Sequence, residues 1–169
     1  ILDFGGQYTQ LIAKTVRKQK VFSEIVDCNH NIGDIIRNRP KGIILSGGPD
    51  SVYEKGAPYI NEYLLERGIP VLGLCYGMQL INFLLKGKIL HGDVVKEYGA
   101  TEVQVDNTHP LFCGLEQKII GWMSHGDKVA VLPKGFTRLA HTQNTDFACI
   151  GNKQSKLYGV QFHPEVVHT

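Results

Sequence analysis

Apolar residues along the first half of the chain follow two alternating patterns, one typical of buried strands and one typical of helices. Short apolar segments occur at residues 1–4, 42–45 and 70–74, and a segment rich in branched and aromatic residues at 21–26. Segments with helical spacing occur at 7–19, 32–37, 59–67 and 76–85. In the segment 7–19, for example, Tyr8, Ile12 and Val16 lie on one face of a helix. Strands that are apolar throughout and separated by helices predict a parallel sheet covered on both faces.

The pattern changes from about Lys88 onward. Short strand-like segments at 101–105, 118–122, 136–140, 147–150 and 157–162 are separated by turn residues rather than by helices, which predicts antiparallel pairing. The sequence has no internal repeat, low-complexity stretch or linker. It therefore predicts one α/β domain over residues 1–169, with an open, mostly parallel sheet flanked by helices and a smaller antiparallel part in the C-terminal half.

Composition agrees with a globular domain and argues against several classes of function. The chain has 169 residues, of which 43% are hydrophobic and 20% charged, so it can bury a core without a disulfide or a structural metal. The net charge of +2 comes without a basic run, which argues against a nucleic-acid binder, and no apolar stretch is long enough to span a membrane. The four cysteines lack the paired spacing of a zinc site, and no segment resembles a signal peptide. These features favour a cytoplasmic protein.

Chemistry in open parallel sheets gathers beyond the carboxyl ends of the strands, and the sequence places a cysteine there. Cys75 follows the apolar segment 70–74, precedes a helical segment, and has Gly73 and Gly77 two positions away on either side. This is the cysteine counterpart of the G-x-S-x-G nucleophile elbow. A helix N-terminus beside the sulfur favours the thiolate, and the backbone N–H of Tyr76 can donate to an oxyanion. The alternative is a small buried cysteine with a packing role only.

One of the seven histidines is placed to serve such a nucleophile as a base. His163 follows the strand-like segment 157–162, and Pro164 and Glu165 come directly after it. Pro164 keeps His163 in extended backbone. A carboxylate that accepts from one ring nitrogen leaves the other nitrogen free to face a thiol. The alternative is a histidine in a surface loop beside a solvated glutamate.

The segment Ser46–Ser51 reads S-G-G-P-D-S and matches the phosphate loop of ATP pyrophosphatases. Its context argues against ATP binding, because Pro49 removes a backbone donor and residues 52–58 have no helical period. The loop is better suited to supply a second oxyanion donor, the backbone N–H of Gly48, near Cys75. A plain turn after a strand is the remaining alternative.

Together these residues resemble the class I, triad-type glutamine amidotransferases. The elbow G-L-C-Y-G-M-Q (73–79) and the distant H-P-E (163–165) are shared across that class. The segments most similar to the amidotransferase domain of the GMP synthase family are D-F-G-G-Q-Y (3–8), S-G-G-P-D-S (46–51), W-M-S-H-G-D (122–127) and Q-F-H-P-E-V (161–166). The resemblance extends over essentially the whole chain and implies the flavodoxin-like fold of the class I amidotransferases.

The resemblance implies a role for each motif residue. Cys75 would be the nucleophile, His163 the general base and then acid, and Glu165 the group that orients His163. The backbone N–H groups of Gly48 and Tyr76 would form the oxyanion hole. The residues expected to hold glutamine are Gly47, Gln79, Ser124, His125 and Asp127. Asp127 would position this segment, touch a partner domain or cap a turn.

The resemblance also implies a reaction. The domain would hydrolyse glutamine to glutamate and ammonia through a cysteine thioester, without a metal or cofactor of its own. The ammonia would serve the ATP-dependent amination of XMP to GMP in guanine nucleotide biosynthesis. Two alternatives stay open. One is the amidotransferase of another synthetase, of the anthranilate or carbamoyl phosphate type, and the other is a non-catalytic glutamine-sensing or scaffold domain.

A partner is implied as well. In that family a synthetase part, with ATP-pyrophosphatase and dimerisation regions, follows the H-P-E segment, and it is absent from this sequence. ATP and Mg²⁺ are therefore expected only in that part. The synthetase part belongs either to the same longer chain or to a separate subunit, and the cut look of both chain ends favours the longer chain. The resemblance implies that the full-length enzyme is a homodimer through the missing regions.

Overall fold

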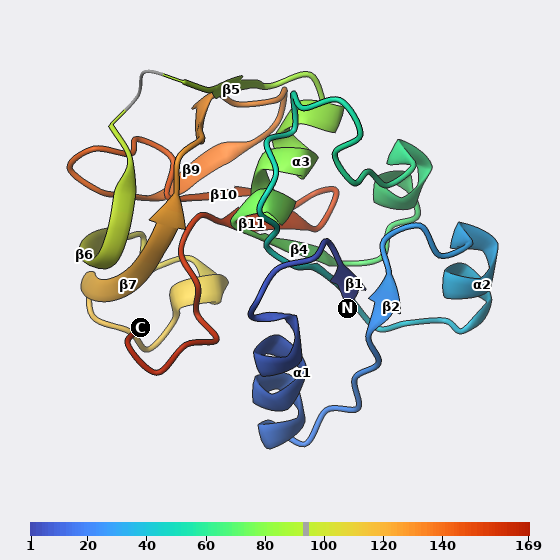
Figure 1. Cartoon of the computed structure of the whole chain (residues 1–169). Helices are drawn as coiled ribbons and strands as arrows, with labels where there is room; N and C mark the ends of the chain where they lie inside the picture. The colour runs from blue at the N-terminus through green and yellow to red at the C-terminus, as the bar shows by residue number, and fades with distance from the viewer. Residues whose placement is uncertain (93–94) are drawn as a thin grey trace.

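A computed structural model describes residues 1–92 and 95–169 and places a mixed sheet at the centre of the molecule (Figure 1). Within these residues the sheet has nine strands in the order β2-β1-β3-β4-β11-β10-β9-β6-β7, and a second sheet pairs β5 with β8. The strands of the large sheet are β1 (Leu2–Asp3), β2 (Val26–Asp27), β3 (Ile43–Leu45), β4 (Val71–Leu74), β6 (Glu97–Val105), β7 (Lys118–His125), β9 (Thr137–His141), β10 (Cys149–Asn152) and β11 (Leu157–Val160). The small sheet consists of β5 (Lys88–Leu90) and β8 (Lys128–Val131).

The large sheet is parallel in one half and antiparallel in the other. The strands β2, β1, β3, β4 and β11 pair in parallel, whereas β11, β10, β9, β6 and β7 pair in antiparallel fashion. β11 is the junction, because it pairs in parallel with β4, where Val160 is the partner of Leu74, and antiparallel with β10. The predicted fold class is confirmed. Its antiparallel part is the second half of this sheet together with the β5–β8 pair.

Helices cover both faces of the parallel half (Figure 1). The helical elements are α1 (Thr9–Lys18), α2 (Ile32–Arg37), α3 (Tyr76–Leu84) and the 3₁₀ segments η1 (Glu62–Glu66) and η2 (Pro110–Phe112). Two clusters of buried apolar side chains form the core, one containing Met78 of α3 and the other containing Ile12 of α1. Within the described residues, no helix is both long and apolar enough to cross a membrane.

The strand predicted at residues 21–26 is largely wrong, since only its last residue takes part in β2. Val21 and Phe22 are 55% and 89% exposed. The carbonyl oxygen of Ser23 accepts a hydrogen bond from Nη2 of Arg17 at 2.7 Å. Most of the segment is therefore held to α1 by the side chain of Arg17 and not by pairing with another strand.

The helix predicted at residues 59–67 is present only as the 3₁₀ segment η1. It begins after Asn61, whose side chain accepts from the backbone N–H of Tyr63 at 3.0 Å, and it ends before Gly68, which has a φ of +69°. The segment between these signals holds a 3₁₀ helix of five residues, little more than one turn. The sequence pattern does not predict β5 and β8, because both are short and each is stabilised by pairing with the other at long sequence distance.

Candidate active site

Cys75 lies at the sharp turn between β4 and α3, as the sequence predicts. Its backbone has φ +50° and ψ −105°, a conformation that non-glycine residues rarely adopt and that costs on the order of 1–3 kcal/mol. The backbone N–H of Cys75 donates to the carbonyl oxygen of Val160 on β11 at 2.8 Å, which fixes the turn against the neighbouring strand. Backbone strain at a cysteine that lines a cavity is typical of a functional site.

The two glycines of the elbow are required by close backbone packing. A Cβ on Gly73 would lie 2.4 Å from the carbonyl oxygen of Gly77, and a Cβ on Gly77 would lie 2.4 Å from the carbonyl oxygen of Leu45 on β3. Rotating a side chain cannot relieve either contact, because the opposing atoms belong to the backbone. α3 therefore begins directly on the sheet, with its N-terminus at Cys75.

His163 follows β11 and forms a buried pair with Glu165. Nδ1 of His163 lies 2.7 Å from Oε1 of Glu165, and the two side chains are 6% and 2% exposed. The ring of Tyr8 contacts the His163 ring edge-on, with centroids 5.0 Å apart. Because the carboxylate occupies Nδ1, Nε2 is the ring nitrogen available to the cavity and to Cys75.

Opposing effects set the pKa of His163. Burial alone would lower this pKa, but the hydrogen bonds with Cys75 and Glu165 and the charges of both groups outweigh burial and raise the pKa to about 9. The ring therefore holds its proton at neutral pH in the resting site. The site thus contains a sulfur nucleophile beside a proton donor, the combination that acyl transfer from an amide requires.

A cavity of about 570 Å³ opens in front of this pair. All the site residues predicted from the sequence line it except Glu165, which lies behind His163. The lining consists of Gly5, Gly6, Gln7, Tyr8, Gly47, Gly48, Pro49, Asp50, Ser51, Glu54, Cys75, Tyr76, Gln79, His91, Tyr98, Ser124, His125, Gly126, Asp127 and His163. Segments that follow β1, β3 and β4 meet here at the carboxyl edge of the sheet, where open α/β folds bind ligands.

The loop after β3 forms the wall closest to the cysteine. A Cβ on Gly47 would lie 3.7 Å from Cβ of Cys75 and 3.2 Å from Cε1 of His163, and a Cβ on Gly48 would lie 3.4 Å from Cγ of Tyr76. Tyr76 is the first residue of α3, so its backbone N–H has no partner within the helix. Gly48 thus packs against Tyr76, the residue that directly follows Cys75.

The same loop does not continue into a helix, since residues 49–60 form turns and irregular structure. Oγ of Ser46 accepts from the backbone N–H of Phe4 at 3.0 Å and donates to the carbonyl oxygen of Gly47 at 2.8 Å, so the loop is tied to the end of β1. This arrangement agrees with the interpretation of S-G-G-P-D-S as a wall of the cysteine site rather than a phosphate loop.

The turn between β7 and β8 forms the opposite wall. The carbonyl oxygen of Ser124 accepts from Sγ of Cys75 at 3.6 Å, and the carbonyl oxygen of Asp127 accepts from Nε2 of Gln79 at 2.9 Å. Gln79 is 3% exposed, so this bond to the turn is well shielded from water. The turn is therefore held directly against the elbow and the first turns of α3.

The carboxylate of Asp127 ties the two walls together. Its Oδ2 accepts from Oγ of Ser51 at 2.5 Å, and its Oδ1 lies 2.8 Å from Nδ1 of His91. Of the roles that the sequence left open for Asp127, the structure is in keeping with a positioning one, because this carboxylate links the loop after β3 to the turn after β7.

Sequence reasoning missed several residues of this site. Gln161 donates from Nε2 to Sγ of Cys75 at 3.5 Å, and it lies within the Q-F-H-P-E-V segment, which is a signal that could have found it. Ser51 closes the S-G-G-P-D-S segment, which is a signal as well, whereas no motif marks His91 or Glu97. Ser51 and His91 line the cavity and contact Asp127, and Glu97 contacts His125, each across a long stretch of sequence. Within the described residues, no group of three or more His, Cys, Asp or Glu side chains is arranged to hold a metal ion.

A strained cysteine elbow facing a buried His–Glu pair, on a mostly parallel α/β sheet, is the arrangement of a triad amidotransferase. The whole chain, residues 1–169, matches the family model described as glutamine amidotransferase class-I. The chain therefore belongs to the class-I glutamine amidotransferase family.

Its relatives are more specific. Among curated proteins, the chain is similar to the glutamine-hydrolyzing GMP synthase of Caldanaerobacter subterraneus subsp. tengcongensis, with 53% identity over 169 residues that make up 100% of this chain and 33% of that protein. The corresponding protein of Prochlorococcus marinus strain AS9601 is 52% identical over 100% of this chain and 32% of its own length. The chain thus spans about a third of the length of these relatives.

Solved structures show the same fold. A protein of Thermoplasma acidophilum, provisionally assigned as one of the subunits of a GMP synthase, superposes with a TM-score of 0.88 at 30% identity and covers 99% of this chain and 84% of its own. A glutamine amidotransferase of Thermotoga maritima, 21% identical, has a TM-score of 0.75 over 97% of this chain and 71% of its own. The second likeness is a likeness of fold alone.

Proposed function

We propose that this chain hydrolyses the side-chain amide of glutamine to glutamate and ammonia through a thioester on Cys75. The observation that carries the proposal is the buried His163–Glu165 pair beside a strained, cavity-facing cysteine. Membership of the class-I amidotransferase family and relatives named glutamine-hydrolyzing GMP synthases support it.

The first half of the reaction uses the proton that His163 holds at neutral pH. The Cys75 thiolate attacks the carboxamide carbon, and the C=O electron pair moves onto the oxygen. The backbone N–H groups of Gly48 and Tyr76 donate to this oxyanion, and each well-placed donor contributes on the order of 100-fold in rate. When the intermediate collapses, the C–N bond breaks, the imidazolium protonates the amine, and ammonia leaves.

The second half reverses the role of His163. The ring, now neutral, takes a proton from water while the water oxygen attacks the thioester carbon. The C–S bond then breaks, releasing glutamate and restoring the thiolate–imidazolium pair. Glu165 accepts from Nδ1 of His163 throughout, which fixes the tautomer and stabilises the imidazolium each time it forms.

The amino-acid end of glutamine is assigned to the outer part of the cavity. Gly47, Gln79 and the turn Ser124–Asp127 all line the cavity. The turn is anchored to the elbow through Cys75 and Gln79. Contacts at this end would place the carboxamide at the sulfur, so that binding energy is used for orientation.

We assign the ammonia to the ATP-dependent amination of XMP to GMP. The assignment is supported by the two GMP synthases that are about half identical to the whole chain, of which the chain spans about a third. In this proposal a synthetase part is the partner and holds ATP and Mg²⁺, the reaction takes place in the cytosol, and the enzyme dimerises through that part. The glutaminase site itself needs no metal or cofactor. An anthranilate or carbamoyl phosphate type of synthetase is the competing enzyme interpretation, and a non-catalytic scaffold would have no use for an intact Cys–His–Glu set.

Covalent labelling with an electrophilic glutamine analogue, read by intact mass and peptide mapping, tests the hydrolytic proposal. A single adduct on Cys75 that excess glutamine prevents is expected. Burial raises the pKa of Cys149 and of Cys28, so both are poor competitors, and the exposed Cys113 is the internal control for unspecific alkylation. Equal labelling of Cys75 and Cys113, unaffected by glutamine, would contradict the proposal.

The assignment to GMP synthesis has its own test. The chain is mixed with [amide-¹⁵N]glutamine and either the synthetase part of a close relative with ATP, Mg²⁺ and XMP, or the synthase part of an anthranilate synthase with Mg²⁺ and chorismate. Transfer of ¹⁵N to XMP alone is expected. Transfer to chorismate, or release of ammonia without amination of XMP, would refute the assignment and leave the hydrolytic proposal intact.

A further inference from the structure

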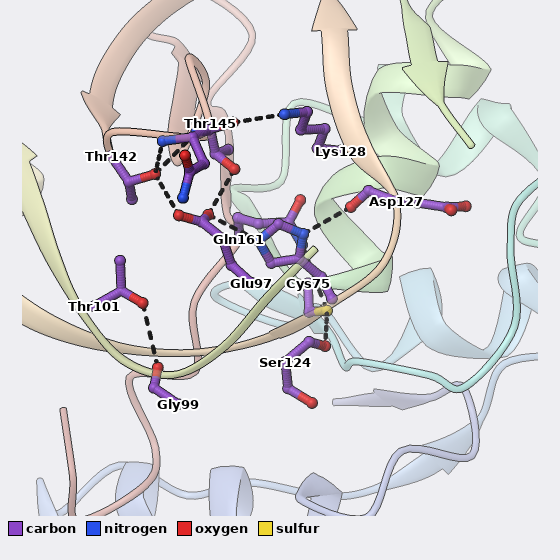
Figure 2. A network of polar contacts seen from close by, with 12 residues as sticks. Cys75, Glu97, Gly99, Thr101, Ser124, Asp127, Lys128, Thr142, Thr145 and Gln161 are labelled. Atoms are coloured by element: carbon purple, nitrogen blue, oxygen red, sulfur yellow. Dashed lines mark hydrogen bonds and ion pairs between the residues drawn. The ribbon is translucent and has the colours of Figure 1, made fainter. Parts of the chain in front are cut away.

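Glu97 lies at the start of β6, behind the glutamine-facing turn. It is the register partner of His125, the last residue of β7. The Glu97 and His125 side chains are 4% and 1% exposed, and Oε2 of Glu97 lies 3.3 Å from Nε2 of His125. Figure 2 shows Glu97 beneath a turn that carries Thr142 and Thr145. Burying an ionisable pair in a core costs free energy of folding, so we expect this pair to have a role that offsets the cost.

The carboxylate of Glu97 is held in place by two hydroxyl donors. Oγ1 of Thr142 donates to Oε1 at 2.7 Å, and Oγ1 of Thr145 donates to Oε2 at 2.6 Å. The Thr142 hydroxyl has one hydrogen, and its lone pairs accept from the backbone N–H groups of Asn144 at 3.2 Å and Thr145 at 2.9 Å. Its hydrogen is therefore committed to Glu97, and the orientation of the carboxylate follows from the β9–β10 turn.

The ring of His125 links the carboxylate of Glu97 to the turn that lines the active site. Its Nδ1 lies 2.9 Å from the carbonyl oxygen of Asp127, which can only accept, so Nδ1 carries a hydrogen. Its Nε2 faces Glu97, so the ring is bonded on both sides only when a hydrogen also lies between Nε2 and the carboxylate. Burial lowers the pKa of His125, and the charge of Glu97 opposes that effect. Without a hydrogen-bond partner at Nε2, the single hydrogen of a neutral ring could lie on Nε2 instead of Nδ1. The hydrogen bond to the carbonyl oxygen of Asp127 would then be lost.

We propose that Glu97 is a positioning residue, which fixes the ring of His125 and through it the turn Ser124–Asp127 that receives the amino-acid end of glutamine. The inference rests on the proposed glutaminase function. Among the described residues that line the cavity, Glu97 is absent, so it acts through His125 and not on the substrate. The carbonyl oxygen of Asp127 accepts from Gln79, and that of Ser124 lies 3.6 Å from Sγ of Cys75, so a shift of the turn moves glutamine relative to the sulfur.

Two substitutions separate the reach of Glu97 from its charge. Glu97→Asp keeps the charge but is one methylene too short to contact both His125 and the threonines. Glu97→Gln removes the charge but keeps the reach. Its amide nitrogen can donate one hydrogen to Nε2 of a neutral His125 and the other to Oγ1 of Thr145, while its oxygen accepts from Thr142. The amide donor keeps the hydrogen of His125 on Nδ1 and preserves the bond to Asp127. The matched control is Glu102→Gln on the same strand, where Glu102 is 54% exposed and pairs with Lys118.

The readout is the saturation kinetics of Cys75 labelling by the electrophilic glutamine analogue, compared with labelling by iodoacetamide, which needs no glutamine pocket. For Glu97→Asp we expect the half-saturating concentration of the analogue to rise about tenfold, the effect of losing one charged hydrogen bond. For Glu97→Gln we expect a rise of less than about threefold and for Glu102→Gln no change. Iodoacetamide rates should stay within about twofold of the parent for all three, because the elbow itself is intact.

Every outcome either supports or overturns the proposal. Thermal unfolding confirms that each variant is folded. A folded Glu97→Asp variant with an unchanged half-saturating concentration overturns the proposal, and so does a parallel change of the analogue and iodoacetamide rates, which would indicate a loosened fold. Should Glu97→Asp not fold, a tenfold loss in a folded Glu97→Gln variant overturns it and a loss below threefold supports it. Failure of the parent chain to show glutamine-protected labelling would refute the glutaminase function first, and the inference with it.

Discussion

Nδ1 of His163 and Oε1 of Glu165 are 2.7 Å apart in a site where neither side chain is more than 6% exposed. A hydrogen bond to a carboxylate that is this short and this shielded is among the strong ones. Together with the hydrogen bond and the charge of Cys75, it keeps the pKa of this buried imidazole raised although burial opposes the charge.

Replacing the carboxylate should therefore change both the pKa of His163 and the rate. In Glu165→Gln we expect the pKa of His163 to fall from about 9, because the stabilising negative charge is gone. We expect ammonia release to drop by about 100-fold or more, since general acid–base catalysis depends on this ring. NMR titration of the His163 Cε1 proton measures the first effect and a glutaminase assay the second. An unchanged pKa would show that Cys75 alone sustains the proton.

The titration of His163 also predicts how stability depends on pH. The pKa is about 9 in the folded chain against 6.5 for the unperturbed group, so the stabilising contribution of the imidazolium is complete below about pH 6.5. It is lost as the pH rises through about 9, because the folded state binds more protons than the unfolded one across that window. The thermal midpoint should therefore fall between pH 6.5 and pH 9. In His163→Gln this part of the fall should be absent, and an identical profile in that variant would assign the dependence to other groups.

The elbow glycine Gly77 should not tolerate even one additional carbon. In Gly77→Ala the new Cβ would meet the carbonyl oxygen of Leu45 at 2.4 Å, and α3 would have to shift away from the sheet. We expect a loss of about 2–3 kcal/mol in the free energy of unfolding, the upper range for overpacking, measured by urea titration. Gly42→Ala is the matched control, because its Cβ would meet no atom closer than 3.6 Å. Equal effects of the two substitutions would contradict the packing argument.

The Ser51–Asp127 hydrogen bond should contribute to glutamine binding without touching the sulfur. In Ser51→Ala the loop after β3 loses its tie to the turn after β7. We expect the KM for glutamine to rise about threefold to tenfold, in line with about 1 kcal/mol for such a bond, while kcat changes little. Ser155→Ala serves as the control, since within the described residues the buried Oγ of Ser155 has no hydrogen-bond partner. A change in kcat alone would assign Ser51 to the chemical step.

How far the site could be predicted from the sequence depends on how local each contribution is. The elbow around Cys75 and the H-P-E segment can be recognised from a few consecutive residues. A tight turn requires glycine or proline at neighbouring positions, so its signal is local in the sequence. The apolar periodicity likewise predicts β3, β4, α1 and α3, whose cores are continuous in the sequence. These elements are the ones that bring the loop ends to the carboxyl edge of the sheet.

The remaining features depend on contacts that no local pattern encodes. Glu97 and His91 are recruited by residues that lie 28 and 36 positions further along the chain. The segment beginning at Val21 has strand-like composition, yet the bond from Arg17 to Ser23 holds it to α1 without a sheet partner. In each case contacts between residues far apart in the sequence determine the local structure, which composition alone does not specify.

The parallel pairing of β4 with β11 has a consequence for when chemistry can begin during folding. Cys75 and Gln161 meet across 86 residues of sequence, and His163 comes only two residues after Gln161. A chain that has formed its N-terminal strands but not this closure carries a thiol without its proton partner. Because long loops close late, selective reactivity of Cys75 would appear only with the completed sheet. The folding chain thus gains a reactive sulfur only with the strand pairing that spans the greatest sequence separation in the described sheet.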